Sequence, residues 1–174
     1  MSNSELESGF KEANRFLQLR DYSSAVKLLL KIKKQYPDEP LVNFNLGIAY
    51  YKAGIIIKSI YSLEEAVRKG ADNSEVYNQL GLACDKNNDI PGARAYYKKA
   101  LEYDPFYSMA WNNMGVSYFL EGDFFSARFY FEKALEINKL DPDAWFNLRD
   151  TCTELGLADE ADEADSRYHE LLHH

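Results

Sequence analysis

Residues 108–141 read SMAWNNMGVSYFLEGDFFSARFYFEKALEINKLD, and this stretch decides the fold. It contains two runs with the spacing of one helix face: first Trp111, Met114, Gly115 and Tyr118, and then, after a Gly-Asp turn, Ala127, Phe131 and Ala134. The two runs predict two antiparallel helices. Small residues at Gly115 and Ala127 would let these helices approach closely, while the aromatic residues fill the flanking space.

The same spacing recurs every 34 residues. Identical residues stand at that interval: Trp111 and Trp145; Gly47, Gly81 and Gly115; Ala66, Ala100 and Ala134. A frame of 34 residues divides the chain without insertion into units of about 6–39, 40–73, 74–107, 108–141 and 142–174. A fixed period of this length is typical of stacked helical repeats. We therefore expect one repeat domain over residues 1–174.

The residues at these places resemble the tetratricopeptide repeat (TPR) family, whose pattern runs Trp, Leu-Gly, Tyr, then Ala, Phe and a terminal Pro. Beside 108–141, the third unit matches through Tyr77, Leu80, Gly81, Ala93, Tyr97, Ala100 and Pro105, and the second through Leu46, Gly47, Tyr50, Leu63 and Ala66. The resemblance implies an all-α fold, a right-handed α-solenoid (superhelix) of five antiparallel helix pairs.

The last two units depart from the pattern in ways that lead to two predictions. Arg149 replaces the small residue in the fifth unit, and an acidic helix over about 158–172 follows, so we expect this unit to act as a cap. No Pro lies between Ala134 and Asp141, which predicts that the second helix of the fourth unit runs about a turn longer than its counterpart in the third.

In the TPR family the first helix of each unit lines a concave groove that binds ligands, and the resemblance implies the same groove here. By helical phase, the candidate peptide-binding residues are Phe44, Asn45, Ile48, Tyr51, Asn78, Gln79, Leu82, Asn112, Asn113, Val116, Phe119 and Asn147. Asn45, Gln79, Asn113 and Asn147 recur every 34 residues and are expected to form a ladder of amides. An amide suits an extended peptide backbone, although the same amides can instead bond locally or face water.

Charge and composition exclude several classes of partner. Residues 141–174 hold ten Asp or Glu against two Arg, so this end carries the whole net charge of −8 and would repel a phosphate backbone. We expect no nucleic acid partner, no membrane span and no secretion signal, and hence a cytoplasmic protein, although a removed leader would leave the same sequence. Cys84 and Cys152 are too few for a zinc site and stand two units apart, which argues against a disulfide.

Ile55, Ile56 and Ile57 follow one another in the turn after Gly54. Three successive apolar residues should leave at least one exposed, which makes this stretch a candidate for self-association. Outward aromatic residues such as Tyr61 and Phe129 add to this alternative, although packing between neighbouring units also accounts for them.

His169-Glu170-Leu171-Leu172-His173 matches the HExxH motif of zinc metalloproteases, so a zinc-dependent hydrolase is a remote alternative. Only His174 follows, without a third ligand or a walled cavity, and the last His residues can derive from a purification tag. We therefore predict no enzyme, no metal and no cofactor. The leading hypothesis is a protein-binding adaptor or scaffold that holds a peptide or helix of its partner. The alternative is a structural protein that mainly forms a homo-oligomer through its apolar outer or edge surfaces.

Overall fold

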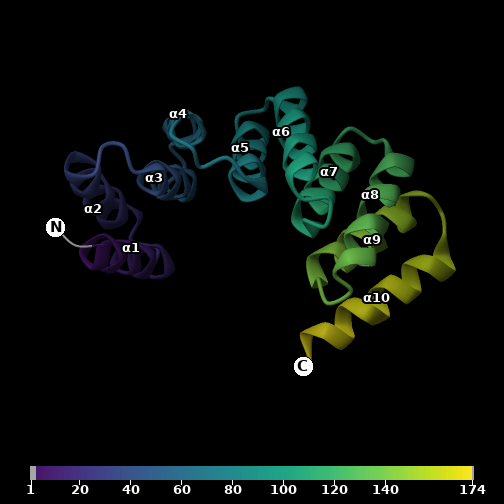
Figure 1. The fold of residues 1–174 in the computed structure, drawn as a ribbon. Coiled ribbons are helices and arrows are strands. Elements are labelled where there is room, and N and C mark those ends of the chain that lie inside the picture. Colours follow the sequence, from purple (N-terminus) through teal and green to yellow (C-terminus); the bar gives the residue numbers. More distant parts are fainter. Residues whose placement is uncertain (1–2, 174) are drawn as a thin grey trace. The chain divides into compact units, whose positions relative to one another are not determined.

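The structure, a computed structural model, describes residues 3–173. This part of the chain forms ten α-helices and no strand (Figure 1). The helices are α1 (Asn3–Gln18), α2 (Tyr22–Gln35), α3 (Pro40–Lys52), α4 (Ile56–Arg68), α5 (Ser74–Lys86), α6 (Ile90–Tyr103), α7 (Ser108–Leu120), α8 (Phe124–Ile137), α9 (Pro142–Glu154) and α10 (Ala158–Leu172). Among these helices, none is long and apolar enough to cross a membrane.

The chain divides into two compact units, residues 1–89 with α1 to α5 and residues 90–174 with α6 to α10. Within each unit, helices that follow one another in the chain pack side by side. This arrangement confirms the predicted fold class, an all-α solenoid of helical repeats. The grouping of all five repeats into one domain stays a prediction.

The turn after the first helix of each repeat has the same backbone throughout. Its central residue has a φ between 58° and 82°, and the five residues concerned are Arg20, Gly54, Asn88, Gly122 and Gly156. The next N–H then donates to the carbonyl oxygen five residues earlier, as from Asp123 to Tyr118 at 3.1 Å and from Leu157 to Cys152 at 2.9 Å. This pairing is a Schellman motif, which satisfies carbonyl groups at the end of the helix.

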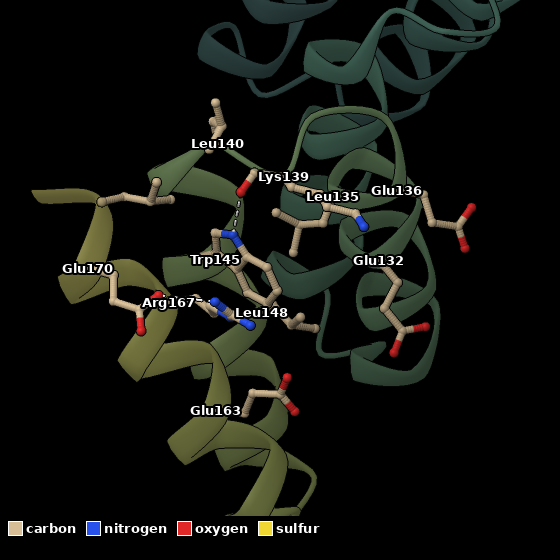
Figure 2. Close-up of a pocket in the computed structure, with 11 residues that line it drawn as sticks. Glu132, Leu135, Glu136, Lys139, Leu140, Trp145, Leu148, Glu163, Arg167 and Glu170 are labelled. Atoms are coloured by element: carbon tan, nitrogen blue, oxygen red, sulfur yellow. Dashed lines mark hydrogen bonds and ion pairs between the residues drawn. The ribbon is translucent and has the colours of Figure 1, made fainter. Parts of the chain in front are cut away.

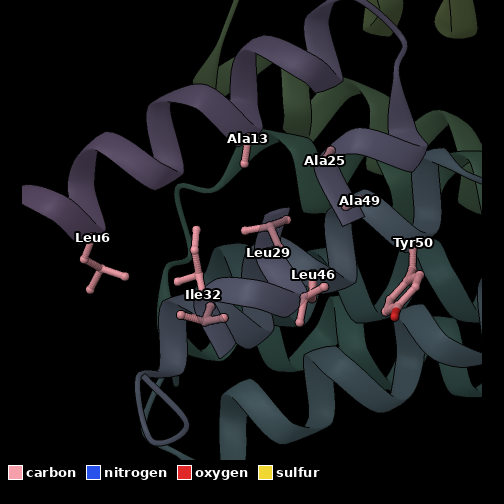
Figure 3. Close-up of a cluster of buried hydrophobic side chains, with 9 residues drawn as sticks. Leu6, Ala13, Ala25, Leu29, Ile32, Leu46, Ala49 and Tyr50 are labelled. Atoms are coloured by element: carbon pink, nitrogen blue, oxygen red, sulfur yellow. The ribbon is translucent and has the colours of Figure 1, made fainter. Parts of the chain in front are cut away.

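Small residues allow the two helices of a repeat to lie close together, as the sequence predicted. A Cβ atom added to Gly115 of α7 would stand 2.5 Å from the Phe131 ring of α8, and one added to Gly47 would stand 2.5 Å from Leu63. In the first repeat the same places hold Ala13 and Leu29, which share one buried cluster (Figure 3). The helix pairs are therefore held at contact distance by interlocking a small residue with a large one.

The fifth repeat replaces this steric pair with charges. Arg149 and Asp165 stand at the places of Gly115 and Phe131, and the guanidinium Nη1 lies 3.1 Å from the Asp165 carboxylate. Arg149 also pairs with Asp150 at 2.7 Å and lies 4.2 Å from the centre of the Phe146 ring. An ion pair thus joins α9 to α10 in place of the small and large apolar residues of the other repeats.

The prediction that α8 runs a turn longer than α6 is wrong, because both helices contain 14 residues. Asn138 ends α8, and its side-chain oxygen accepts the N–H of Leu140 at 3.1 Å. Asp104 does the same for Phe106 at 2.9 Å, one repeat earlier. In both repeats the second helix therefore ends where a side-chain oxygen accepts an N–H of the following loop, and this end does not require a Pro. By contrast, α10 has the bounds that the sequence predicted.

The steric pair can be tested by replacing Gly115 with Ala. Overpacking against Phe131 costs about 1–3 kcal/mol, which outweighs the roughly 0.5–1 kcal/mol that Ala gains over Gly in a helix. We expect Gly115→Ala to lower the free energy of unfolding in urea. Ala13 and Leu29 already occupy these two places in the first repeat. The double variant Gly115→Ala/Phe131→Leu should therefore lose less stability than the sum of the losses in the two single variants. A Gly115→Ala protein as stable as the wild type would contradict this account.

A second test concerns the start of α4. Asp21 and Asp123 cap α2 and α8 by accepting the N–H of Ser24 and Ser126, whereas Ile55 stands at the same place before α4 without a side-chain bond. We expect Ile55→Asp to raise the free energy of unfolding by about 1 kcal/mol at pH 7. Ile55→Ala is the control, since it removes the same apolar group and adds no cap.

The gain from Ile55→Asp should disappear in acid. Hydrogen bonds from Ser24 and from Ser126 lower the pKa of the Asp21 and Asp123 caps below the usual 3.8. A carboxyl group whose pKa is lowered by folding stabilises the folded protein at pH values above its pKa in the unfolded chain. This stabilisation is lost as the pH falls through its pKa in the folded protein. Urea unfolding across this pH range checks the prediction, and a gain that persists below the folded pKa would contradict it.

Candidate functional site

In the unit of residues 90–174, the first-helix face comprises the sides of α7 and α9 that carry Val116, Phe119, Asn147 and Asp150. These four residues line a small cavity together with Phe131 of α8. Three of them, Val116, Phe119 and Asn147, are among the residues that the sequence predicts to contact a peptide. The fold thus brings these three together from two different repeats.

Helix α7 is apolar on more than one side. Its sequence, SMAWNNMGVSYFL, contains no charged residue. Ala110 and Met114 are buried, yet Met109 and Leu120 remain 50% and 70% exposed. A helix that needs only one apolar face for its own hairpin would carry polar residues on the opposite side. Part of the apolar surface of α7 is therefore left exposed by the packing of its own unit.

Amide groups link α7 to α9 on this face. The Asn147 Nδ2 donates to the Asn112 Oδ1 at 3.0 Å. The pair satisfies one donor and one acceptor, and it leaves the Asn112 amide nitrogen and the Asn147 oxygen to bond other groups.

The amide side chains of the predicted ladder do not make the same hydrogen bonds. Asn45 turns back on its own helix and donates to the Leu41 carbonyl at 2.8 Å. Asn147 instead bonds across to the neighbouring repeat. Asn113 and Gln79 are half-buried. A recurring residue type therefore does not fix a recurring hydrogen bond, because the neighbour within reach differs in each repeat.

In residues 1–89, the predicted peptide-binding residues differ in exposure. Ile48, Tyr51 and Leu82 are half-buried, whereas Phe44 is only 8% and Asn78 only 2% exposed. Phe44 and Asn78 therefore offer little surface to a ligand. Burial, and then the Asp85 carboxylate, raise the pKa of Tyr51, so its phenol stays protonated and can donate a hydrogen bond.

The isoleucine run is exposed, as the sequence predicted. Ile55 is 43% and Ile57 67% exposed, while Ile56 is half-buried. Tyr61, one turn after Ile57 on α4, is 57% exposed and joins the same surface. These residues form a small apolar patch beside the start of α4.

The residues of the HExxH match lie at the end of α10. His169 is exposed, with its Nε2 at 3.6 Å from Asp165, and His173 caps the helix. Within residues 3–173, no group of three or more His, Cys, Asp or Glu could hold a metal ion. His174 lies outside the described residues.

The two cysteines are free and buried. Burial, with a smaller effect from nearby carboxylates, raises the pKa of the Cys84 thiol to about 11. A thiol that stays protonated at neutral pH is a poor nucleophile. Cys84 therefore acts as a small packing residue.

Sequence reasoning missed one surface, a groove above Trp145 that α8, α9 and α10 line (Figure 2). The sequence did contain a signal for it. Phe129 and Tyr130 of the fourth repeat are followed 34 residues later by Glu163 and Ala164, so two large rings are missing from the fifth. A comparison of the two repeats position by position would have pointed to this gap.

Comparison with known proteins supports the repeat assignment at two levels. Sequence models described as tetratricopeptide repeat match residues 10–75, 74–107 and 108–141. The last two ranges have the bounds that the 34-residue frame gives for the third and fourth units. A search of curated protein sequences found no match.

Solved structures with similar folds include PilW, described as a widely conserved type IV pilus biogenesis factor. It is 24% identical, with 99% of this chain and 80% of that chain covered at a TM-score of 0.86. PilF of Pseudomonas aeruginosa is 17% identical, with 95% and 75% covered at a TM-score of 0.86. MamA is 22% identical, with 92% and 94% covered at a TM-score of 0.78.

At these identities the likeness to solved structures shows the fold alone. The sequence models, by contrast, together span residues 10–141, which is well over half of the chain. Their matches agree with the helix pairs and with the 34-residue spacing of the turns. The chain therefore belongs to the tetratricopeptide repeat family.

Proposed function

We propose that this protein is an interaction adaptor that binds a peptide or a helix of a partner protein on the first-helix face of its repeats. Tetratricopeptide repeat proteins generally serve protein–protein interaction as adaptors or scaffolds and are generally not enzymes. The observation that carries the proposal here is the second apolar side of α7, which has no charged residue.

The chemistry of the face suits a peptide. Val116 and Phe119 supply half-exposed apolar surface beside a small cavity, where an aliphatic side chain can be buried. Asn112 and Asn147 lie next to this surface and offer one donor and one acceptor for a peptide group. Apolar contacts then supply most of the affinity, while the amides orient the backbone.

The proposal predicts the behaviour of Val116→Glu. Peptides selected from a random 12-residue library on the wild-type protein should lose affinity about tenfold or more, because a carboxylate would be buried against their apolar side chains. Isothermal titration calorimetry measures the change. Phe125→Glu is the matched control, since Phe125 of α8 is 79% exposed and lies outside the cavity lining. Selected peptides that bind Val116→Glu and wild type alike would contradict the proposal.

A second candidate function, self-association, rests on the exposed patch of Ile55, Ile57 and Tyr61. If this patch joins two copies, sedimentation equilibrium should give a mass that rises with concentration. Ile57→Glu should then hold the mass at that of a monomer, because a charge at the centre of an apolar contact is costly. Leu19→Glu is the control, since Leu19 is also 67% exposed and belongs to a different repeat. A constant monomer mass for the wild type would exclude this function.

A further inference from the structure

The Trp145 groove lies between α8 and α10, with α9 beneath it, and has a volume of about 640 Å³. Its lining consists of Glu132, Leu135, Glu136, Lys139, Leu140, Trp145, Leu148, Glu163, Arg167, Glu170 and Leu171. Figure 2 shows the indole of Trp145 in the middle, with residues of α8 on one side and residues of α10 on the other. A hollow of this size can accommodate several side chains of a ligand.

The groove exists because the fifth repeat lacks the aromatic cover of the fourth. Around Trp111, the Tyr130 ring lies at 5.7 Å and the Phe129 ring at 6.5 Å. Glu163 and Ala164 stand at the corresponding places beside Trp145. In the described part of the chain, no aromatic ring packs on Trp145. Trp145 is half-buried, as Trp111 is, but it lacks the aromatic neighbours of Trp111.

The floor of the groove is apolar and fixed in place. Trp145 lies beside Leu135 of α8 and Leu148 of α9, both of which belong to the buried core. The indole Nε1 donates to the Lys139 carbonyl at 2.9 Å, which fixes the orientation of the ring (Figure 2). A ligand that packs on this ring therefore meets a preformed surface and orders little of the protein on binding.

The rim of the groove is mostly acidic. Glu132 and Glu136 come from α8, and Glu163 and Glu170 come from α10, against one Lys and one Arg in the lining. Three of these carboxylates already have partners, since Glu132 pairs with Arg128 at 2.7 Å, Glu136 with Lys133 at 2.7 Å and Glu170 with Arg167 at 3.1 Å.

Glu163 is different. Among residues 3–173, no cation pairs with it. Residues 141–174, which contain α9 and α10, carry ten acidic residues and two Arg, so the field around Glu163 is negative. The groove therefore presents a free carboxylate on its rim and, in its floor, an indole that no aromatic ring covers.

We propose that the Trp145 groove binds a cationic amphipathic segment of a partner protein, with an apolar side chain against the indole and a Lys or Arg beside Glu163. Charge complementarity selects this occupant. The same groove of a second copy would bring the same acidic rim and be repelled. The groove lies on α8 and α10, so the proposal does not depend on peptide binding at the first-helix face.

The position of Arg167 supports a cationic ligand. This side chain lines the groove and pairs with Glu170, so a guanidinium already fits against the same acidic wall. Arg167 also offsets part of the acidic charge. Removing it in Arg167→Ala should therefore strengthen the binding of a cationic peptide, while a charge reversal at Glu163 should weaken it.

The binding test uses a defined probe and the whole chain. The probe is an acetylated and amidated 12-residue peptide with Leu at helical spacing and Lys at the other places. Binding is followed through the indole N–H signal of Trp145 in ¹H–¹⁵N spectra. The variant Trp111→Phe removes the signal of the other Trp and so assigns that of Trp145. We expect the Trp145 signal to shift saturably, and the apparent affinity to fall as salt is raised. Peptides with Leu→Ser or Lys→Glu throughout are the controls and should not bind.

Variants locate the binding in the groove. Glu163→Lys should weaken the peptide about fivefold, whereas Asp162→Lys, with the same charge change at an exposed residue outside the lining, should have a much smaller effect. Glu163→Phe copies Phe129 and should abolish binding by covering the indole. The proposal is overturned if the Trp145 signal does not move, if the Ser peptide binds equally well, or if both Lys variants weaken binding alike.

Discussion

The whole structure depends on how closely the two helices of a repeat approach each other. Where Gly47 and Gly115 face Leu63 and Phe131, a single added carbon would collide with the opposing side chain. This contact brings apolar side chains of both helices into one core, which supplies most of the stability of a short helix pair. In the fifth repeat Arg149 and Asp165 replace the small and large residues with an ion pair. The fifth repeat therefore joins its two helices by a polar contact where the other repeats use an apolar one.

The loops between repeats show how one structural requirement is met by different residues. Trp111 and Trp145 donate to the carbonyls of Pro105 and Lys139, at 2.8 and 2.9 Å. In the second repeat Asn43 stands at the same place, buried and without a hydrogen-bond partner, and the Lys69 ammonium donates to the Pro37 carbonyl instead. In each case a side chain of the following repeat donates to a carbonyl of the loop that precedes that repeat.

The unit of residues 90–174 presents two surfaces of different chemistry. The first-helix face of α7 and α9 combines apolar side chains with amides, which suits a neutral peptide backbone. The Trp145 groove combines an apolar floor with an acidic rim, which suits a cationic ligand.

The sequence predicted the helix pairs, their turns at 34-residue intervals and the places of the small residues, because these follow from local helix periodicity and from turn residues. It also identified Val116, Phe119 and Asn147 as candidate peptide-binding residues, and the fold brings these three to one cavity. The tertiary structure alone showed that Asn45 bonds its own helix, that Phe44 is buried and that α8, α9 and α10 line a groove around Trp145. The physical reason is that hydrogen-bond partners and exposure depend on which side chains of neighbouring helices come within reach, and periodicity does not specify those neighbours.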